Sequence, residues 1–411
     1  MGDMEWGILA PEEMVSLRRQ QSLGLQASVR HFNDRSVPGL GNLWFPMPLV
    51  WSILAVALAE EGHSSVEPLR TANAIEAFAM GGTGDSQNPR VQGRVKLNGN
   101  KDWSFSNLAK RGTYVTQPFR MGMVQPLQEL GYVIGSRFGS FRLDGEGHRI
   151  MQLPAMQSWK DQLARWIRIK SKTQESPPGL SPLVALPADV RKNIQARVKQ
   201  AYRTSPEDAA RRRALIGLAT GPNEKMLERE PPPSGISHEH WIDLRAGAAL
   251  IDLRDCALDV LRAVEGKLLE RRNANEAASC GVPEMTRYVQ TKLRDLQYSE
   301  KRLGPRIEVA GEHLSCAFLA DCRKDPETLL RKLVTRDGTV VRLEAADRIV
   351  PGPAAGDLRA DRSSEEEAGE VIDNQDFAPQ LFRLWNLHCL MRELNGHENP
   401  QSPDYPTKAP A

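Results

Sequence analysis

Residues 103–151 read WSFSNLAKRGTYVTQPFRMGMVQPLQELGYVIGSRFGSFRLDGEGHRIM, and this stretch decides the expected fold. Its first part, 103–110, predicts a short helix, and 111–113 predicts a turn. Thr116 can cap the next helix, and Pro118 then falls in the first turn, where its missing N–H group is not needed. Apolar residues recur along one side of that helix, which predicts a buried face. They are Met121, Val124, Leu127 and Leu130.

The remainder of the stretch predicts two short strands and a further helix. Gly131 is the expected stop of the preceding helix, and Tyr132 and Val133 begin an extended run. Apolar and polar side chains alternate over 137–143, as they do in a half-buried strand. Asp144 can cap the helix that follows.

Two short motifs in this stretch are similar to a known pattern. Residues 127–131 (LQELG) and 141–147 (FRLDGEG) resemble the L-x-x-L-G and F-x-L-x-x-x-G motifs of bacterial winged helix-turn-helix domains. The resemblance implies a winged helix over residues 68–152. The wider chain also resembles, more loosely, bacterial proteins that accompany helicases or nucleases in phage-defence loci. Pro126 departs from the pattern, because a proline inside a regular helix costs about 3 kcal/mol. Either the helix kinks there or two short turns replace it.

A winged helix of this kind implies contact with double-stranded DNA. Its third helix enters the major groove, and its wing reaches the backbone or the minor groove. The side of that helix opposite its apolar face displays Gln117, Arg120 and Gln125, and arginine and glutamine have the donors and acceptors that read base edges. The predicted DNA-binding residues come from the turn, the helix and the wing. They are Lys110, Arg111, Thr113, Tyr114, Gln117, Arg120, Gln125, Arg137 and Arg142.

The bulk composition limits where such a surface can lie. The chain has 411 residues, enough for two or three domains, and 40% hydrophobic with 26% charged residues is typical of a globular protein. A formal net charge of +2 requires any nucleic-acid surface to be a local patch. Five cysteines without a regular spacing favour a reducing cytoplasm. The acidic start, Met1–Glu5, does not resemble a signal peptide.

Outside the central stretch, helical periodicity dominates, so the expected fold is mainly α with small β elements. The uncharged segment 43–59 is shorter than the ~20 residues that span a bilayer and predicts a buried core helix, with no membrane contact. The expected divisions are a helical N-terminal region (1–67), the winged helix (68–152), a basic helical middle (153–230), a helical region with a strand pair (231–351), an acidic linker (352–374), and a C-terminal helix with a tail (375–411).

Individual elements of these regions carry their own signals. The helices are expected near residues 11–23, 48–59, 68–80, 187–202, 239–272, 282–296 and 377–394, with further helix starts at Ser205 and Asp325. An extended segment is expected at 307–318 and a strand pair at 340–350. The basic helices at 160–172 and 191–213 either follow a phosphate backbone or have solvated amphipathic faces, and the sequence does not choose between the two.

Catalytic motifs are not recognisable. The glycine-rich residues 81–84 are not followed by the Lys-Ser/Thr of a phosphate loop, and no carboxylates cluster as in a metal-dependent nuclease. His313, Cys316 and Cys322 are spaced loosely for zinc and are more typical of small apolar core residues. The residues 238–240 (HEH) are not an H-E-x-x-H motif. We therefore expect no enzyme activity, no cofactor and no metal.

These observations together predict a non-catalytic DNA-binding subunit. The phage-defence resemblance implies a bacterial defence complex, with a helicase, ATPase or nuclease subunit as the protein partner. The alternative is a protein–protein adaptor or scaffold that uses the winged helix as a docking unit.

Overall fold

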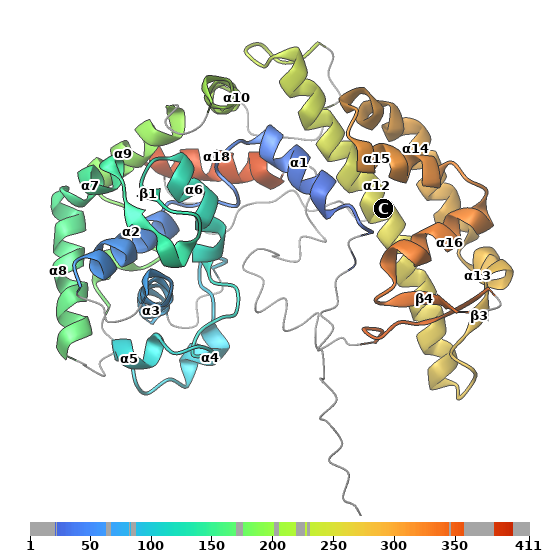
Figure 1. Cartoon of the computed structure of the whole chain (residues 1–411), viewed down its shortest axis with the longest axis horizontal. Coiled ribbons are helices and arrows are strands. Elements are labelled where there is room, and N and C mark those ends of the chain that lie inside the picture. Colours follow the sequence, from blue (N-terminus) through green and yellow to red (C-terminus); the bar gives the residue numbers. More distant parts are fainter. Residues whose placement is uncertain are drawn as a thin grey trace, which may run out of the picture.

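The structure is a computed structural model that describes residues 21, 23–62, 67–81, 83, 88–169, 176–200, 205–218, 227, 231–344, 347–356 and 382–397. Its architecture is mainly helical with small antiparallel sheets. The described part of the chain forms two lobes, which lie side by side in Figure 1. Each lobe has its own hydrophobic core.

The first lobe contains the elements from α2 to α10 and the C-terminal helix α18. They are α2 (Met47–Glu60), α3 (Pro68–Met80), α4 (Arg94–Asn98), α5 (Phe105–Leu108), η1 (Phe119–Met123), α6 (Val124–Glu129), β1 (Val133–Ile134), η2 (Phe138–Ser140), β2 (Arg142–Leu143), α7 (Gly145–Met151), α8 (Pro154–Ile169), η3 (Pro178–Leu180), α9 (Ala188–Lys199), α10 (Pro206–Ile216) and α18 (Phe382–Leu394).

Helix α2 is the centre of the first lobe. All residues from Met47 to Leu58 are buried, and α3 and α8 pack against them. This confirms the buried helix expected from the uncharged segment. Phe78 on α3 stacks on Trp166 of α8, with ring centroids 4.0 Å apart, which adds a specific aromatic contact to the apolar burial. In the described residues no helix is both long enough and apolar enough to cross a membrane.

One core extends across several of the divisions expected from the sequence. It contains residues of α2 and α3, of α7 and α8, and of α18. The boundaries at 67/68 and 152/153 therefore do not separate structural units, because α2 packs against both α3 and α8 and all three helices belong to one core. Residues 68–152 share their core with the segments on both sides of them.

The second lobe contains the remaining elements. They come from two parts of the sequence, one before the elements of the first lobe and one after most of them. They are α1 (Gln26–Ser36), α12 (His238–Asn273), β3 (Cys280–Gly281), α13 (Val282–Tyr288), α14 (Gln290–Ala310), α15 (His313–Cys322), α16 (Pro326–Asp337), β4 (Val341–Glu344) and β5 (Arg348–Pro351). Helices α12 and α14 pack along each other, and the three strands form an antiparallel sheet in the order β3-β5-β4. The β4–β5 pair confirms the predicted strand pair, with Val341 opposite Pro351.

The extended segment expected at 307–318 is wrong. Gly311 ends α14 with a φ of 67°, and α15 begins two residues later. The Glu312 side chain caps α15 by accepting hydrogen bonds from the backbone N–H groups of Leu314 and Ser315. A short apolar run fits a buried helix as well as a strand, and here the acidic cap and the glycine stop select the helix.

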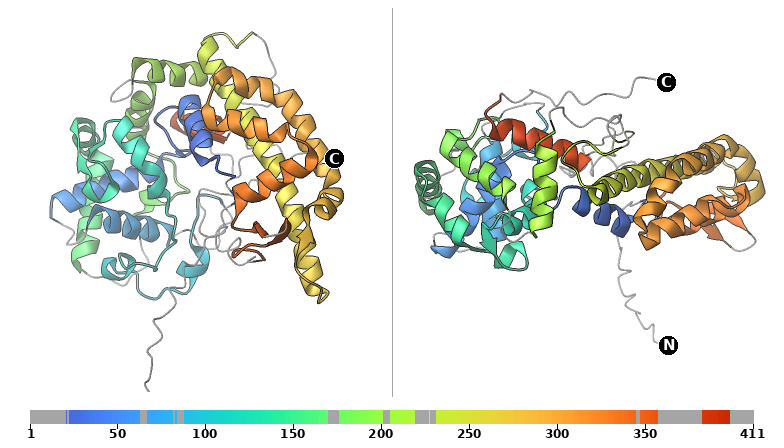
Figure 2. Two further views of the ribbon diagram at one scale, coloured as in Figure 1. Left: turned by 45° about the vertical axis from the view of Figure 1, so that its right-hand side comes forward. Right: turned by 90° about the horizontal axis from the view of Figure 1, so that it is seen from above.

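Helix α12 joins the two lobes. Trp241 and Leu244 in its first turns belong to the first core, whereas most buried apolar residues from Ala249 to Leu268 belong to the second. Phe32 of α1 packs directly on Gly247 of α12. A Cβ at position 247 would lie only 2.9 Å from the Phe32 Cβ, so the glycine allows this close contact. Viewed from above, α12 leaves the first lobe and runs the length of the second (Figure 2).

Several other predicted elements agree with the structure. The predicted cap residues Ser205 and Asp325 accept hydrogen bonds from backbone N–H groups in the first turns of α10 and α16. The C-terminal helix is confirmed over 382–394, and its predicted start at 377 lies outside the described residues. The helix expected at 11–23 and most of the acidic linker 352–374 also fall outside the described part of the chain.

Candidate nucleic-acid interface

A buried carboxylate on α3 organises the segment that was expected to read DNA. Glu76 is 1% exposed, and its two carboxylate oxygens accept hydrogen bonds from the backbone N–H groups of Phe119 (2.9 Å) and Arg120 (3.2 Å). The Tyr114 hydroxyl donates a third bond, over 3.1 Å. Three donors therefore compensate the buried carboxylate and hold residues 114–120 against α3. The sequence signal for this role is a single acid on the apolar face of a helix, between Ile75 and Ala79.

The electrostatics of Glu76 reflect its burial. Loss of hydration raises the pKa of the Glu76 carboxyl to about 7, although the bonds from Phe119, Arg120 and Tyr114 oppose the shift. Burial also raises the pKa of the Tyr114 hydroxyl well above its usual value, with the Glu76 carboxylate adding to the effect. Tyr114 is 4% exposed, so the structure places this predicted phosphate contact inside the lobe, where it cannot reach a ligand.

Arg120, the residue expected to read a base, is engaged within the protein. Its Nε donates to the Asn73 side-chain oxygen on α3, and its guanidinium carbon lies 5.7 Å from the centroid of the Phe138 ring. Burial lowers the pKa of the Arg120 guanidinium, partly offset by the Glu76 carboxylate. The side chain therefore braces η1 and η2 against α3. The prediction that Arg120 is free to read a base in the major groove is therefore wrong.

The expected recognition helix has a different course from the prediction. It is split into the 3₁₀ turn η1 and the short helix α6, so that two short turns replace one helix around Pro126. The proline then lies in the first turn of α6, where no intrahelical N–H bond is needed. The helix opens at Phe119 and not after Thr116.

The predicted apolar face is confirmed at Leu127 and Leu130, which are fully buried, and at Val124, which packs against the core, but it is wrong at Met121. Met123 is 2% exposed and lies in the core, whereas Met121 is 46% exposed. No residue of α6 is exposed, and the loop through Gly41 lies against it: a Cβ on Gly41 would be 3.3 Å from the Gly122 carbonyl oxygen. Gln125 is half-buried under the same loop, 3.7 Å from that position. Only Pro126 and Leu127 of α6 are fully buried, but the helix presents no fully exposed side chain to a major groove.

The predicted wing is a small hairpin. Val133 pairs with Leu143 and Ile134 with Arg142, in antiparallel register. Residues 138–140 form the 3₁₀ turn η2, so the strand expected over 137–143 is limited to Arg142–Leu143. Phe138 and Phe141 are buried, so the connection is fastened to the core. Arg137 and Arg142 are nevertheless exposed.

The DNA-binding residues predicted at and after the turn are likewise exposed in part and half-buried in part. Lys110 and Arg111, directly after α5, are exposed. Thr113 is half-buried, and its hydroxyl donates to the Asn107 carbonyl oxygen over 3.1 Å. Gln117 is also half-buried. Of the predicted residues, the structure therefore leaves four cations on the surface: Lys110, Arg111, Arg137 and Arg142. None of these four forms an ion pair within the described ranges.

Several arginines of the basic middle have structural partners. Arg212 is fully buried and donates to the carbonyl oxygens of Val198 (3.1 Å), Pro38 (3.1 Å) and Gln200 (2.9 Å). Arg197 is buried and donates to the Leu130 carbonyl oxygen. The sequence left two roles open for the basic helices, phosphate binding or a solvated face. Neither applies to Arg197 and Arg212, because their side chains are buried and bonded to carbonyl groups.

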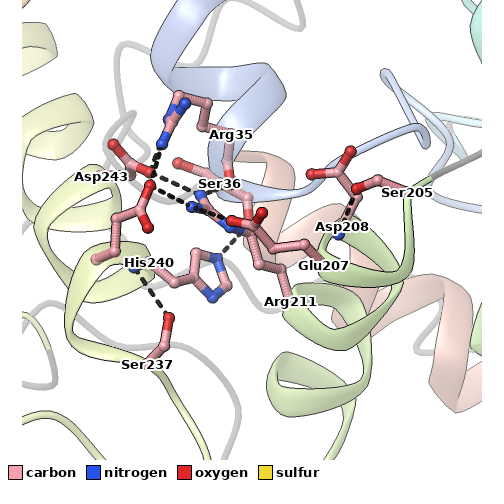
Figure 3. A network of polar contacts seen from close by, with 10 residues as sticks. Arg35, Ser36, Ser205, Glu207, Asp208, Arg211, Ser237, His240 and Asp243 are labelled. Atoms are coloured by element: carbon pink, nitrogen blue, oxygen red, sulfur yellow. Dashed lines mark hydrogen bonds and ion pairs between the residues drawn. The ribbon is translucent and has the colours of Figure 1, made fainter.

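Arg211 belongs to a polar network at the junction of α1, α10 and α12 (Figure 3). The Asp243 carboxylate on α12 accepts from Arg211 Nη1 over 2.6 Å and from Arg35 Nε over 2.8 Å. Beside them, His240 lies 2.9 Å from the Ser36 carbonyl oxygen through its Nε2 atom, and burial lowers the pKa of its imidazole. The residues 238–240 are thus the capped start of α12, as expected, with Ser237 as the cap.

The possible zinc ligands are separated on one helix. His313 is exposed, Cys316 is half-buried and Cys322 is fully buried, all on α15. Burial raises the pKa of the Cys322 thiol to about 12, which disfavours the thiolate that a metal would need. Across the described ranges, no group of three or more His, Cys, Asp or Glu side chains is arranged to hold a metal ion.

Comparisons with protein-family models, with curated protein sequences and with solved structures gave no match for this chain. The functional argument therefore rests on the geometry of its own residues.

Proposed function

We propose that the protein is a non-catalytic DNA-binding subunit that holds the phosphate backbone of a duplex through Lys110, Arg111, Arg137 and Arg142. The observation that supports this most is the exposure of these four cations in a region where Arg120 and Arg197 are engaged by the protein itself. Unpaired cations on a surface release counterions from DNA when they bind, and this term supplies most of the sequence-independent affinity.

The spacing of the two pairs of cations fits an extended ligand. Trp103, which precedes α5, packs on Gly81 at the C-terminal end of α3, and η2 lies next to Glu67 at its N-terminal end. The thirteen residues of α3 span about 20 Å. Lys110 and Arg111 follow α5 and Arg137 precedes η2, and both of these elements pack against α3. A separation close to the length of α3 corresponds to about six base pairs, at 3.4 Å per base pair.

This proposal differs from base reading by a recognition helix. Because no residue of α6 is fully exposed and Arg120 is bonded to Asn73, the proposal assigns affinity to phosphate contacts and assigns no sequence preference to η1 or α6. A winged-helix relationship for residues 68–152 remains part of the proposal. It is supported by the order of its elements, in which the helical segments α3, α4, α5, η1 and α6 are followed by the β1–β2 hairpin.

The test is fluorescence anisotropy with a labelled 30-base-pair duplex of random sequence, measured across a salt series. Four phosphate contacts predict a slope of about −3.6 in a plot of log affinity against log salt concentration. The quadruple variant with alanine at Lys110, Arg111, Arg137 and Arg142 should lose that slope. A matched control removes four cations that already form ion pairs: Arg254, Arg262, Arg331 and Arg342. Equal losses in both variants, or no duplex binding at low salt, would contradict the proposal.

The alternative function is a protein–protein adaptor, with a helicase, ATPase or nuclease subunit as the partner. It is favoured by two exposed apolar side chains in the same region, Met121 on η1 (46% exposed) and Ile134 on β1 (40% exposed). In a pull-down with a candidate partner, Met121→Glu and Ile134→Glu should then remove binding that persists at high salt. The four-cation variant should retain that binding.

A further inference from the structure

Helix α14 has one face that no part of the described chain covers. Its inner residues Leu293, Leu296 and Leu303 are buried in the second core against α12. On the opposite side, residues recur at helical spacing and are exposed: Thr291, Arg294, Tyr298, Lys301, Arg302 and Val309. In Figure 1, α14 lies on the side of α12 that faces away from the first lobe.

This outer side carries an exposed aromatic ring. Tyr298 is 71% exposed, the largest exposed fraction among the large apolar and aromatic side chains of the described residues, equal to that of Val95. A tyrosine this exposed gains little from burial, so it is available for contact with a ligand. Tyr288 near the start of α14 is also exposed, but Lys267 Nζ already lies 5.1 Å from its ring centroid.

Cations surround Tyr298 on the same side of the helix. Arg294 precedes it by four residues, and Lys301 and Arg302 follow it by three and four, so all four side chains share one face. None of these three cations forms an ion pair within the described part of the chain, where Asp295 is the exposed acid between them.

Three other surface arginines of the second lobe have acidic partners. Arg262 pairs with Asp259 over 2.8 Å, Arg342 pairs with Glu344 over 3.0 Å, and Arg331 pairs with Asp347. These surface charges are locally balanced. The α14 face, which we define as Arg294, Tyr298, Lys301 and Arg302, carries three cations against the one exposed acid Asp295, so its net charge is positive and an anionic partner complements it.

The combination of an exposed ring and unbalanced cations selects the class of anion. Bases of a single strand are free to stack on an aromatic side chain while neighbouring cations hold the phosphates. Bases in a duplex are already stacked on each other and are not accessible to a ring on a convex helix. The segment from Arg294 to Arg302 spans about 12 Å along α14, enough for a few nucleotides.

We propose that the α14 face binds single-stranded nucleic acid, with an unpaired base stacked on Tyr298 and phosphates held by Arg294, Lys301 and Arg302. This site is separate from the duplex contacts proposed for the first lobe and does not depend on them. The two sites together would suit a protein that contacts a junction between paired and unpaired strands.

The experiment measures anisotropy of a labelled 15-nucleotide oligo-dT with the full chain at low salt. Tyr298→Ala should weaken binding roughly ten-fold or more, the range expected for loss of one base–aromatic stack. Tyr298→Trp should keep the affinity, because it preserves a ring. The triple variant Arg294→Ala, Lys301→Ala, Arg302→Ala should reduce the slope of log affinity against log salt by about 2. The control variant Arg262→Ala, Arg331→Ala, Arg342→Ala should not reduce it.

Several results would overturn the proposal. They are no binding of oligo-dT at low salt, equal affinity of Tyr298→Ala and the unmodified chain, or equal effects of the two triple variants. Tighter binding of an acidic peptide such as oligo-glutamate than of oligo-dT, unaffected by Tyr298→Ala, would assign the face to a protein partner and also refute it. The proposal for the first lobe is tested by a different result. It fails if the variant without Lys110, Arg111, Arg137 and Arg142 still binds a duplex as the unmodified chain does.

Discussion

Removal of the Asp243 carboxylate should destabilise the junction between the lobes strongly. The side chain is 7% exposed and accepts charge-assisted hydrogen bonds from Arg211 (2.6 Å) and Arg35 (2.8 Å). Breaking a buried ion pair by deleting one partner costs about 3–5 kcal/mol, since the other charge stays buried. Arg211 is 5% exposed, but Glu239 (3.2 Å) and Glu207 (3.3 Å) remain near it. We therefore expect Asp243→Ala to lower the free energy of unfolding by about 3 kcal/mol.

The assay is urea unfolding followed by tryptophan fluorescence and by far-UV circular dichroism. The tryptophans in the described ranges all lie in the first lobe, on α18 or in the first turns of α12, so fluorescence reports the first core. A matched control is Asp259→Ala, whose partner Arg262 is 47% exposed, and which should cost no more than about 1 kcal/mol. If Asp243→Ala cost no more than this control, the assignment of Asp243 as a buried partner for two arginines would be refuted.

Three further predictions concern buried groups. Because the pKa of Glu76 is raised from 4.5 to about 7, the folded state keeps a proton that the unfolded state loses in this window, and stability falls as pH rises through it. Glu76→Gln should remove this fall, worth up to about 3 kcal/mol, and parallel urea titrations of both proteins at pH 5 and pH 8 would show it; identical pH dependence would exclude it. Burial lowers the pKa of His240 below 6.5, so the free energy of unfolding should instead decrease as pH falls below about 6.5. His240→Gln should reduce this loss of stability at acid pH. The same acid dependence in the variant would contradict the burial of the imidazole. Gly147→Ala would place a Cβ 2.1 Å from the Tyr132 carbonyl oxygen and should lower the melting temperature, with a cost of about 1–3 kcal/mol, whereas Gly266→Ala, with nothing within 4 Å, should be neutral or stabilising. Equal melting temperatures for the two alanine variants would argue against the close approach of α7 to β1.

The sequence pattern could not predict which cations of the candidate interface are exposed and which are buried. Lys110 and Arg137 are on the surface as expected, but Arg120 and Arg212, which read as equally basic in the sequence, bond to groups far away along the chain. Arg212 donates to the Pro38 carbonyl oxygen, 174 residues distant. An arginine is exposed or buried according to which carbonyl and carboxylate groups the fold brings to it, and those are non-local.

The predicted burial of Met121 in the expected recognition helix was wrong for a related reason, whereas Leu127 and Leu130 are buried as predicted. A regular helix from Thr116 would bury Met121, but the 3₁₀ turn before Pro126 changes the rotation per residue, so Met123 is buried instead. The turn is held in place by Glu76, which lies more than forty residues earlier and binds the N–H groups of Phe119 and Arg120. The periodicity of a segment cannot reveal a distant side chain that determines its backbone.

The sequence by itself determined the elements whose signals are local. Helix α3 has its predicted bounds, α10 begins at its predicted serine cap, and β4 and β5 pair as expected. The buried nature of α2 also followed from its uncharged composition. These features depend on caps, glycine stops and apolar periodicity, which act within a few residues.

Only the tertiary structure decided how these elements combine. It places the core of residues 68–152 in common with α2 and α8, and brings α18 back onto the first lobe, where Glu393 forms a buried ion pair with Arg90 over 2.7 Å. It also leaves the α14 face uncovered while its inner side is buried against α12. Burial is a property of neighbours in space, and the amphipathic pattern of one helix specifies that a face is buried without specifying which element covers it.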